Sequence, residues 1–203
     1  PGPSDYAGIY NNIIFSTDTV RNGTHSIRIT VTPDAITNNL STKNRTEINY
    51  KHQNVENTEV WYAWSFLVPT DFTELDTELY PNSWNIIGQF HAVPDPDNGM
   101  ESAEGTNPPV AFYLGRENPG DPFGVRLRYG IMNENVDNIG TYEINKGEWV
   151  DIKMHIFWSQ KKSKGFIEAW ANGTSITGGQ VKGQNMHNTQ PHYWKAGFYR
   201  GAV

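Results

Sequence analysis

Short runs in which hydrophobic and polar residues alternate recur along most of the chain. Proline, glycine or asparagine residues separate these runs and mark turns. Because successive side chains of a strand point to opposite faces, an alternation with a period of two predicts β-strands. The expected strands cover residues 26–32, 45–51, 59–68, 83–93, 110–115, 125–131, 148–158, 165–172 and 192–200. Only residues 71–80 could hold a turn or two of helix.

These segments predict an all-β protein, in which we expect ten or more strands in all. Residues 59–68 have aromatic side chains on both faces, which indicates a central strand that is covered on both sides. We therefore expect a β-jelly roll, a two-sheet antiparallel sandwich of the concanavalin-like type with a concave groove. No linker or internal repeat interrupts the pattern, so residues 1–203 are expected to form a single domain. Residues 95–109 are acidic and rich in proline, and we expect a mobile loop there.

Composition and charge narrow the function classes. Aromatic residues make up 13% of the 203 residues and charged residues 19%, with 19 Gly and 12 Pro, which argues against a helix bundle and against disorder. The formal net charge of −6 disfavours general binding to nucleic acid or to an anionic membrane. The sequence contains no cysteine, which excludes disulfides and thiolate metal sites.

The chain carries no signal for a membrane span, because no apolar run approaches the roughly 20 residues that a span needs. It starts at Pro1 without the basic segment and apolar stretch of a signal peptide. We expect the mature form of a secreted protein, from which the signal peptide has been removed. We also expect a monomer.

Several strands combine an apolar row with a polar row that is unusually rich in Arg, Lys, Gln, His and Tyr. For one strand alone, a solvated outer face is the ordinary explanation. Bulky aromatic residues beside cations and amides fit a ligand groove better, and cations gathered in an acidic protein suggest an anionic ligand. The residues of these rows that we expect to bind the ligand are Glu47, Asn49, Arg126, Arg128, Lys153, Lys195 and Tyr199.

Three segments resemble motifs of the β-jelly-roll polysaccharide lyases. Arg45-Thr46-Glu47, Gln89-Phe90-His91 and the segment from Tyr193 to Tyr199 match the R-T-E, Q-x-H and Y-x-K-x-G-x-Y motifs. The family includes jelly-roll alginate lyases, glucuronan lyases, short ulvan lyases and heparin lyase I. Residues 59–66 with Pro69 are similar to the W-Y-x-W-S-F-x-x-P signature of the glucuronan and heparin lyase branch. The resemblance extends over about residues 23–200 and favours a glucuronate-containing substrate such as glucuronan or ulvan.

The resemblance implies that the protein cleaves a uronic-acid polymer by β-elimination. The catalytic set carried over by the motifs is Arg45, Gln89, His91 and Tyr193. Such an enzyme must neutralise the substrate carboxylate before the neighbouring C5 proton can leave, a role that suits Arg45 and Gln89. His91 and Tyr193 are the candidates for base and acid, either as a pair or with Tyr193 in both roles.

The remaining residues of the motifs have expected supporting roles. Lys195 and Tyr199 line the groove, and Glu47 is a fixed partner of Arg45 or Lys195 rather than a catalyst. If Arg45 or Lys195 lies close to Tyr193, we expect the pKa of its phenol to fall.

Three further expectations concern residues outside the catalytic set. Trp61 and Trp64 are expected in the core. His155 shares a face with Lys153, but a structural role for it is equally compatible with the sequence. No metal site is legible and no cofactor is expected to be required. The acidic segment Asp95-Pro96-Asp97 would be the place for a structural Ca²⁺, although such loops are ordinarily just solvated.

Three other functions are compatible with the sequence. An alginate lyase of the same fold would use the same motifs on a different uronate, with either endo or exo action. A glycoside hydrolase would need two carboxylates that face each other, and Glu47, Asp151 and Glu168 lie on separate expected strands. A non-catalytic carbohydrate-binding jelly roll would need only aromatic platforms and hydrogen-bonding groups.

Overall fold

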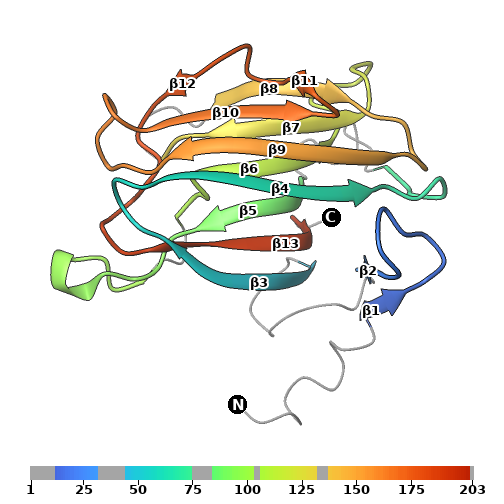
Figure 1. Cartoon of the computed structure of the whole chain (residues 1–203), viewed down its shortest axis with the longest axis horizontal. Helices are drawn as coiled ribbons and strands as arrows, with labels where there is room; N and C mark the ends of the chain where they lie inside the picture. Colours follow the sequence, from blue (N-terminus) through green and yellow to red (C-terminus); the bar gives the residue numbers. More distant parts are fainter. Residues whose placement is uncertain (1–11, 32–43, 75–83, 103–105, 132–136, 202–203) are drawn as a thin grey trace, which may run out of the picture.

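Two antiparallel sheets face each other in the computed structural model of the chain (Figure 1). The structure describes residues 12–31, 44–74, 84–102, 106–131 and 137–201. The larger sheet has six strands in the spatial order β3 (Asn44–Asn54), β13 (His192–Arg200), β5 (Asn85–His91), β6 (Val110–Gly115), β7 (Gly124–Tyr129) and β8 (Asp137–Glu143). Three neighbouring strands of this sheet, β3, β13 and β5, come from separate parts of the sequence.

The second sheet packs against the first and has five strands. Its order is β11 (Thr174–Ser175), β10 (Phe166–Ala171), β9 (Trp149–Phe157) and β4 (Glu59–Leu67), with β12 (Val181–Lys182) also paired to β10. A separate hairpin consists of β1 (Ile13–Ser16) and β2 (Ser26–Ile29). A single turn of 3₁₀-helix, η3 (Pro96–Asn98), lies in the loop after β5. This nearly all-β sandwich confirms the predicted fold class.

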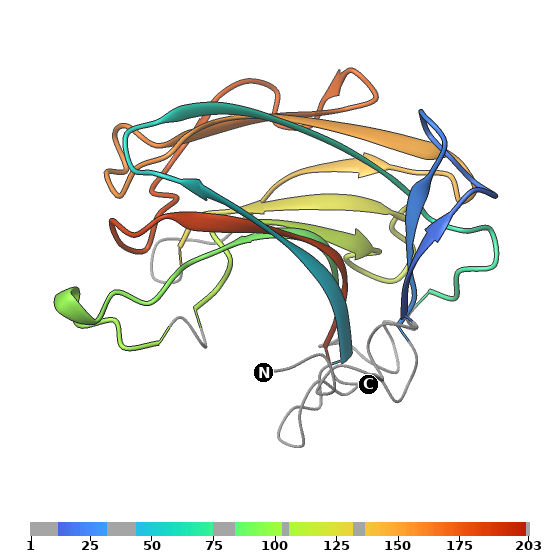
Figure 2. The same ribbon diagram turned by 60° about the horizontal axis from the view of Figure 1, so that its bottom comes forward.

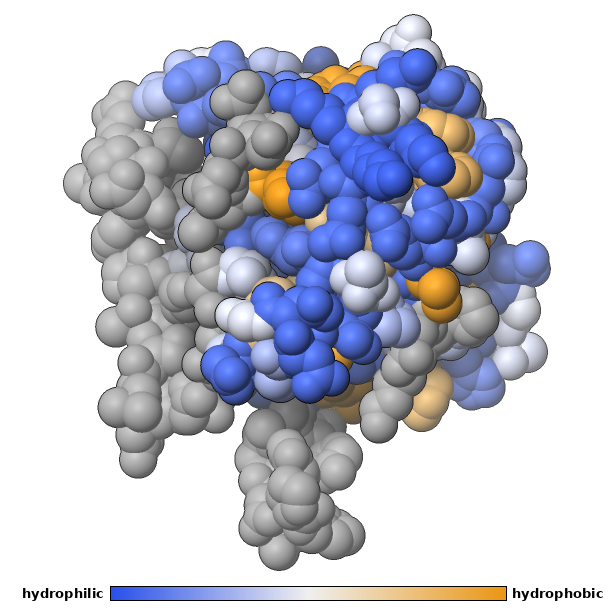
Figure 3. Space-filling view, turned by 90° about the vertical axis from the view of Figure 1, so that its left-hand side faces the viewer, coloured by the Kyte–Doolittle hydropathy of each residue, from blue (hydrophilic) through white to orange (hydrophobic). Residues whose placement is uncertain are grey.

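The six-stranded sheet is curved, and its outer face is concave. Figure 2 shows β3 and β13 bending together, with their concave side turned away from the five-stranded sheet. The end of the sandwich that carries η3 is mostly hydrophilic, with only small hydrophobic spots (Figure 3). Among the described residues, no helix is long and apolar enough to cross a membrane.

Aromatic side chains fill the space between the two sheets. Trp64 of β4 lies 5.5 Å from Trp194 of β13 and 5.8 Å from Phe112 of β6, measured between ring centroids. Phe90 and Trp158 are fully buried and pack against each other with centroids 4.8 Å apart. Since these rings occupy the inner face, their strand neighbours must point to the outer, concave face.

A β-bulge in β5 changes which residues face outward. Ile86 pairs with Tyr113 and Gly88 pairs with Phe112, so Ile87 is an extra residue in β5. Ile87 accordingly joins the main core, although strict alternation predicts that it shares a face with Gln89. The prediction is therefore wrong for the start of this strand, whereas Gln89 and His91 point outward as expected.

Other sequence-based expectations have mixed outcomes. Strand β8 was not expected, because its sequence from Asp137 to Glu143 is polar and carries no clear alternation. The suggested helical turn over residues 71–80 lies mainly outside the described residues. Of the proline-rich segment 95–109, the described part contains η3 and an isolated bridge between Asp95 and Met100.

Candidate active site

The four residues of the expected catalytic set lie on three adjacent strands. Arg45 is on β3, Gln89 and His91 are on β5, and Tyr193 lies on β13 between them. In the register of the sheet, Tyr193 is directly opposite His91. The three strands are not consecutive in the sequence, so the fold brings together segments more than 100 residues apart.

Lys195 links both neighbouring strands to this cluster. It is opposite Gln89 on one side and Asn49 on the other, so one row crosses the sheet at this point. Glu47 is opposite Gly197, one row away on β3. Asn49 is exposed at the edge of the row, whereas Gln89 is only 2% exposed and Lys195 8%.

Glu47 holds the amide of Gln89 in place. Gln89 Nε2 donates a hydrogen bond to Glu47 Oε1 over 2.6 Å, and Lys195 Nζ lies 4.0 Å from Glu47 Oε2. One amide hydrogen of Gln89 is thereby used by Glu47, which fixes the orientation of the other. Glu47 is therefore in contact with Lys195, as expected, and also with Gln89, which the sequence did not indicate.

His91 is oriented as a hydrogen-bond donor at one ring nitrogen. Its Nδ1 lies 3.0 Å from the carbonyl oxygen of Ala92, so Nδ1 carries the proton that this bond requires. Burial, together with the positive charges of Lys195 and Arg45, lowers the pKa of His91, although the Ala92 bond acts in the opposite direction. The imidazole is therefore neutral around pH 7, with a lone pair at Nε2.

Tyr193 differs from expectation in its electrostatics. Burial raises the pKa of its phenol, and the negative charge of Glu47 raises it further, while Arg45 lowers it. The expected fall in pKa was wrong because Glu47 offsets part of the local positive charge and because desolvation disfavours a phenolate. The phenol is thus protonated at neutral pH, and its ring lies 5.8 Å from the His91 ring.

The cluster carries net positive charge despite the acidic composition of the chain. Arg45 and Lys195 are both cationic, and Glu47 is the carboxylate in contact with Lys195. Burial and the nearby Arg45 lower the pKa of Lys195, while Glu47 raises it. With His91 neutral, two cations face one anion, which favours an incoming carboxylate.

Gly197 lets β13 approach β3 at the point where Glu47 sits. A Cβ atom at Gly197 would lie 2.2 Å from the carbonyl oxygen of Thr46 and 2.6 Å from the Cα atom of Glu47. Any larger residue would push the two strands apart and displace Glu47. The glycine of the Y-x-K-x-G-x-Y pattern thus has a steric reason that the sequence alone did not reveal.

Aromatic and cationic residues continue along the concave face. The guanidinium of Arg45 lies 5.4 Å from the ring centroid of Tyr199, whose ring packs edge-on against Trp84 at 4.6 Å. Trp84 lies 6.5 Å from Tyr113, and Arg128 lies 4.9 Å from the Tyr113 centroid. The sequence analysis missed Trp84, because the bulge in β5 reverses the face on which it was expected. It gave no signal for Tyr113, because the strand of Tyr113 shows no polar row.

Arg126 and Arg128 of β7 extend the positive charge towards the far edge of the same sheet. Ala111 is opposite both Gln89 and Arg128, so Arg128 is two strands, roughly 10 Å, from Gln89. Arg126 lies 3.6 Å from Glu117, but its Nε is buried without a hydrogen-bond partner among the described residues.

Two residues are not where the sequence suggested. Lys153 lies on β9 of the five-stranded sheet, so it does not share a surface with Gln89 and cannot contribute to this site. Trp61 was expected in the core but is 56% exposed, because it occupies the outer face of β4. Trp64 lies on the inner face of the same strand and packs against the core as expected.

The described residues contain no group of three or more His, Asp or Glu side chains that could hold a metal ion. The side chain of Asp95, in the acidic segment considered for Ca²⁺, accepts hydrogen bonds from Asn98 and Gln190. His155, the ambiguous histidine, is bound between two carboxylates on the other sheet, with Nε2 2.6 Å from Glu59 and Nδ1 3.3 Å from Glu168.

Comparisons with solved structures identify the same architecture in carbohydrate-active proteins. An endo-β-1,4-glucuronan lyase from the fungus Trichoderma reesei aligns with a TM-score of 0.65 and 18% identity, covering 92% of this chain and 74% of the other. The exolytic PL7 alginate lyase AlyA5 from Zobellia galactanivorans aligns at 0.55 and 16%, covering 92% and 72%. The carbohydrate recognition domain of Emp46p aligns at 0.52 and 7%, covering 97% and 84%. These similarities establish the fold.

Sequence comparison gives the family directly. A search of the curated proteins finds no match to this chain. The model of the polysaccharide lyase family, in contrast, matches residues 8–202, which is almost the whole chain and includes every strand described above. The chain therefore belongs to the polysaccharide lyase family and is a lyase that acts on a polysaccharide.

Proposed function

We propose that the concave face cleaves a uronate-containing polymer by β-elimination. The observation that carries this proposal is that groups suited to bind a carboxylate lie on strands next to a facing histidine and tyrosine. Gln89, Arg45 and Lys195 supply donors and positive charge for a carboxylate, and His91 lies directly opposite Tyr193. A hydrolase would instead need two opposed carboxylates, and the described part of this face offers Glu47 alone within the cluster.

Gln89 and Arg45 neutralise the substrate carboxylate in this proposal. The proton on C5 is only weakly acidic, because the adjacent carboxylate already carries a negative charge. Hydrogen bonds and positive charge at its oxygens stabilise the enolate-like species that forms when the proton leaves. The free hydrogen of the Gln89 amide and the guanidinium of Arg45 suit this role, and Lys195 adds a second positive charge.

His91 acts as the base and Tyr193 as the acid. The neutral imidazole has its lone pair at Nε2, because Nδ1 donates to Ala92. The phenol keeps its proton, because burial and Glu47 raise its pKa. His91 accepts the C5 proton, the electron pair forms the C4–C5 double bond, and the glycosidic oxygen leaves from C4 with the proton of Tyr193.

The substrate we propose is a glucuronate-containing polymer, either glucuronan or ulvan. The W-Y-x-W-S-F segment of β4 and the fold similarity to a glucuronan lyase support this choice. Arg126, Arg128 and Tyr113 would contact further sugar units along the concave face, and Asn49 and Tyr199 would contact units near the reacting bond. We propose that the protein is secreted, because a polysaccharide of many sugar units is degraded outside the cell. We also propose that it works as a monomer.

The test is an assay with a panel of polymers: glucuronan, ulvan, alginate and a neutral glucan. Elimination creates a conjugated double bond, so ultraviolet absorbance rises only if the proposal is correct. We expect the strongest signal with glucuronan or ulvan, and a much lower rate for Gln89→Ala, in which the carboxylate is not neutralised. A strong signal with alginate alone would show that alginate is the substrate instead. New reducing ends without a rise in absorbance would show that the reaction is hydrolysis and not elimination.

A further inference from the structure

The outer face of the five-stranded sheet carries a second aromatic and cationic surface, on the opposite side of the sandwich from the proposed active site. Lys153 Nζ lies 5.2 Å from the ring centroid of Trp61 and 4.6 Å from that of Trp170. The two indoles are stacked, with centroids 5.7 Å apart and planes within 19°. We call these three residues the indole–lysine cluster.

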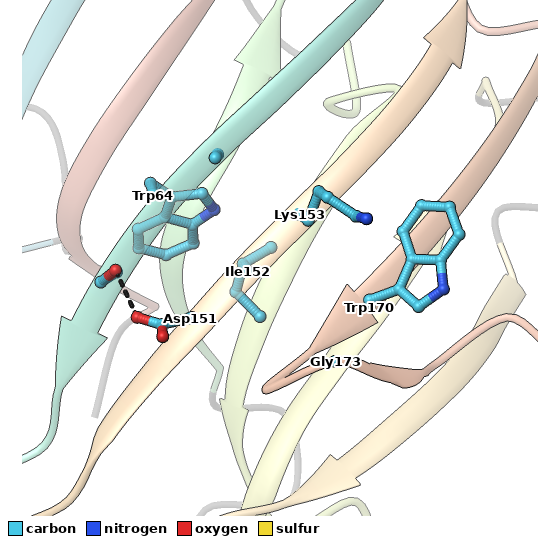
Figure 4. Close-up of a pocket in the computed structure, with 8 residues that line it drawn as sticks. Trp64, Asp151, Ile152, Lys153, Trp170 and Gly173 are labelled. Carbon is cyan, nitrogen blue, oxygen red and sulfur yellow. Dashed lines mark hydrogen bonds between the residues drawn. The ribbon is translucent and has the colours of Figure 1, made fainter.

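A cavity adjoins this cluster. It has a volume of about 420 Å³ and is lined by residues of β4, β9, β10 and the turn after β10, including Ala63, Ser65, Asp151 and Gly173. Figure 4 shows Lys153 and Trp170 on one side of the cavity, with the ammonium group directed towards the indole, and Asp151 bound to Ser65 on the other. The volume is within the range that accommodates a small ligand such as one or two sugar rings.

Each neighbouring carboxylate already has a hydrogen-bonding partner within the protein. Asp151 accepts two hydrogen bonds from Arg21, over 2.9 and 2.6 Å, and one from Ser65 over 2.7 Å. Glu59 and Glu168 both bind His155, which Trp61 covers with a ring stacked at 4.1 Å.

Lys153 is different, because no carboxylate among the described residues lies within 4.0 Å of its ammonium group. Lys153 is therefore the charged group of the indole–lysine cluster, and it has no ionic partner among the described residues. Trp61 meanwhile remains 56% exposed, which is a large apolar surface for a strand residue that faces solvent.

We propose that the indole–lysine cluster is a non-catalytic binding site for a uronate-containing polysaccharide chain. The exposed indole of Trp61 and the half-buried indole of Trp170 would pack against the apolar faces of pyranose rings, and Lys153 would bind a carboxylate. The ligand class rests on the proposed function. Because the two sheets pack back to back about 10 Å apart, a short oligosaccharide cannot occupy both outer faces. The second site therefore adds affinity for long chains only, through multivalency.

Retardation in native gels that contain glucuronan, ulvan or a neutral glucan tests this site without using activity. We expect Lys153→Ala and Trp61→Ala to reduce retardation by the uronate polymer at least threefold. Lys182→Ala is the matched control, since Lys182 is an exposed lysine of the same sheet, on β12, outside the cluster. Lys153→Ala changes an exposed side chain, so it remains informative if Trp61→Ala fails to fold.

The outcomes separate this proposal from the proposed function. Equal retardation of Lys153→Ala and the unaltered protein would overturn the second site, even if elimination is observed. Equal retardation by the neutral glucan would overturn its assignment to an anionic chain. If retardation depends on Lys153 but no polymer yields an unsaturated product, the second site stands and the elimination proposal fails. Turnover of a short uronate oligosaccharide by Trp61→Ala should match that of the unaltered protein.

Discussion

Gln89 Nε2 donates a 2.6 Å hydrogen bond to Glu47 Oε1, across two strand boundaries of the concave face. This bond passes over β13, the strand that carries Tyr193 and Lys195. Glu47 therefore affects three functional groups at once: it orients the Gln89 amide, it partners Lys195, and it raises the pKa of Tyr193. These three effects explain why Glu47 is present in a site that we propose binds the carboxylate of a substrate.

The first prediction uses Glu47→Gln, which removes the charge but keeps an oxygen that can accept from Gln89. Since Glu47 raises the pKa of both Tyr193 and Lys195, its neutralisation lowers both values. The activity carried by the protonated phenol and the ammonium is then lost at lower pH. The alkaline limb of the kcat/KM profile should move to lower pH, and an unchanged limb would contradict this electrostatic role. Glu47→Ala, which also removes the acceptor, should lower kcat further.

The second prediction concerns the proposed acid. Tyr193→Phe removes one hydroxyl group and retains the ring that packs near His91. We expect kcat to fall by about 100-fold or more, the usual scale for a positioned acid. KM should change little, because the loss is confined to the transition state. Tyr142→Phe, a half-buried tyrosine on β8, is the control. Near-normal turnover of Tyr193→Phe would leave the leaving group without its donor and would refute this assignment.

The third prediction concerns the acid limb of the pH profile. Burial and the charges of Lys195 and Arg45 lower the pKa of His91, so the neutral base persists below its ordinary value of 6.5. As the pH falls through this lowered pKa, the imidazole is protonated and kcat/KM decreases. Lys195→Gln removes one of the nearby charges, so we expect the limb to move to higher pH. In His91→Asn the limb should vanish along with most of the activity, and its persistence there would assign it to another group.

The fourth prediction concerns stability rather than activity, at a histidine next to the site. His192 is fully buried, and this burial lowers its pKa to about 4. Its Nδ1 donates to the carbonyl of Gln190, while Nε2 accepts from the backbone amide of His187, an arrangement that only the neutral ring can make. The unfolded chain therefore binds a proton near pH 6.5 that the folded protein resists until about pH 4.

The free energy of unfolding should consequently decrease as the pH falls from about 6.5 to 4, by about 3 kcal/mol from this group. Urea titrations at several pH values measure this decrease. His192→Gln cannot titrate and should show a flatter dependence over the same range. His25→Gln, which changes an exposed histidine, should retain the slope of the unaltered protein. Equal slopes for all three proteins would show that His192 is already protonated in the fold.

The sequence could predict what depends on alternation and on contiguous motifs. The polar rows placed Gln89, His91, Tyr193 and Lys195 on one face correctly, because these strands alternate regularly at those positions. The sequence could not predict the bulge at Ile87, because an inserted residue cannot be recognised from the two-residue alternation. Trp84 was therefore assigned to the wrong face. Lys153 was misplaced for another reason: alternation shows which residues share a face of one strand, but not which sheet that strand joins.

The last prediction tests the packing that positions Gln89. A Cβ atom at Gly88 would lie 2.6 Å and 2.7 Å from two atoms of the Trp194 indole and 3.1 Å from Trp64, and these rings cannot retreat because they pack against Phe90 and Phe112. Gly88→Ala should therefore destabilise the protein by about 1–3 kcal/mol, measured by urea unfolding. Both overlapping Trp194 atoms belong to the distal ring of the indole, so Trp194→Phe makes room for the methyl group. In a double-mutant cycle the two changes together should cost less than the sum of their separate costs. Strict additivity would mean that the backbone of β5 moves instead, and Gln89, the next residue, would move with it.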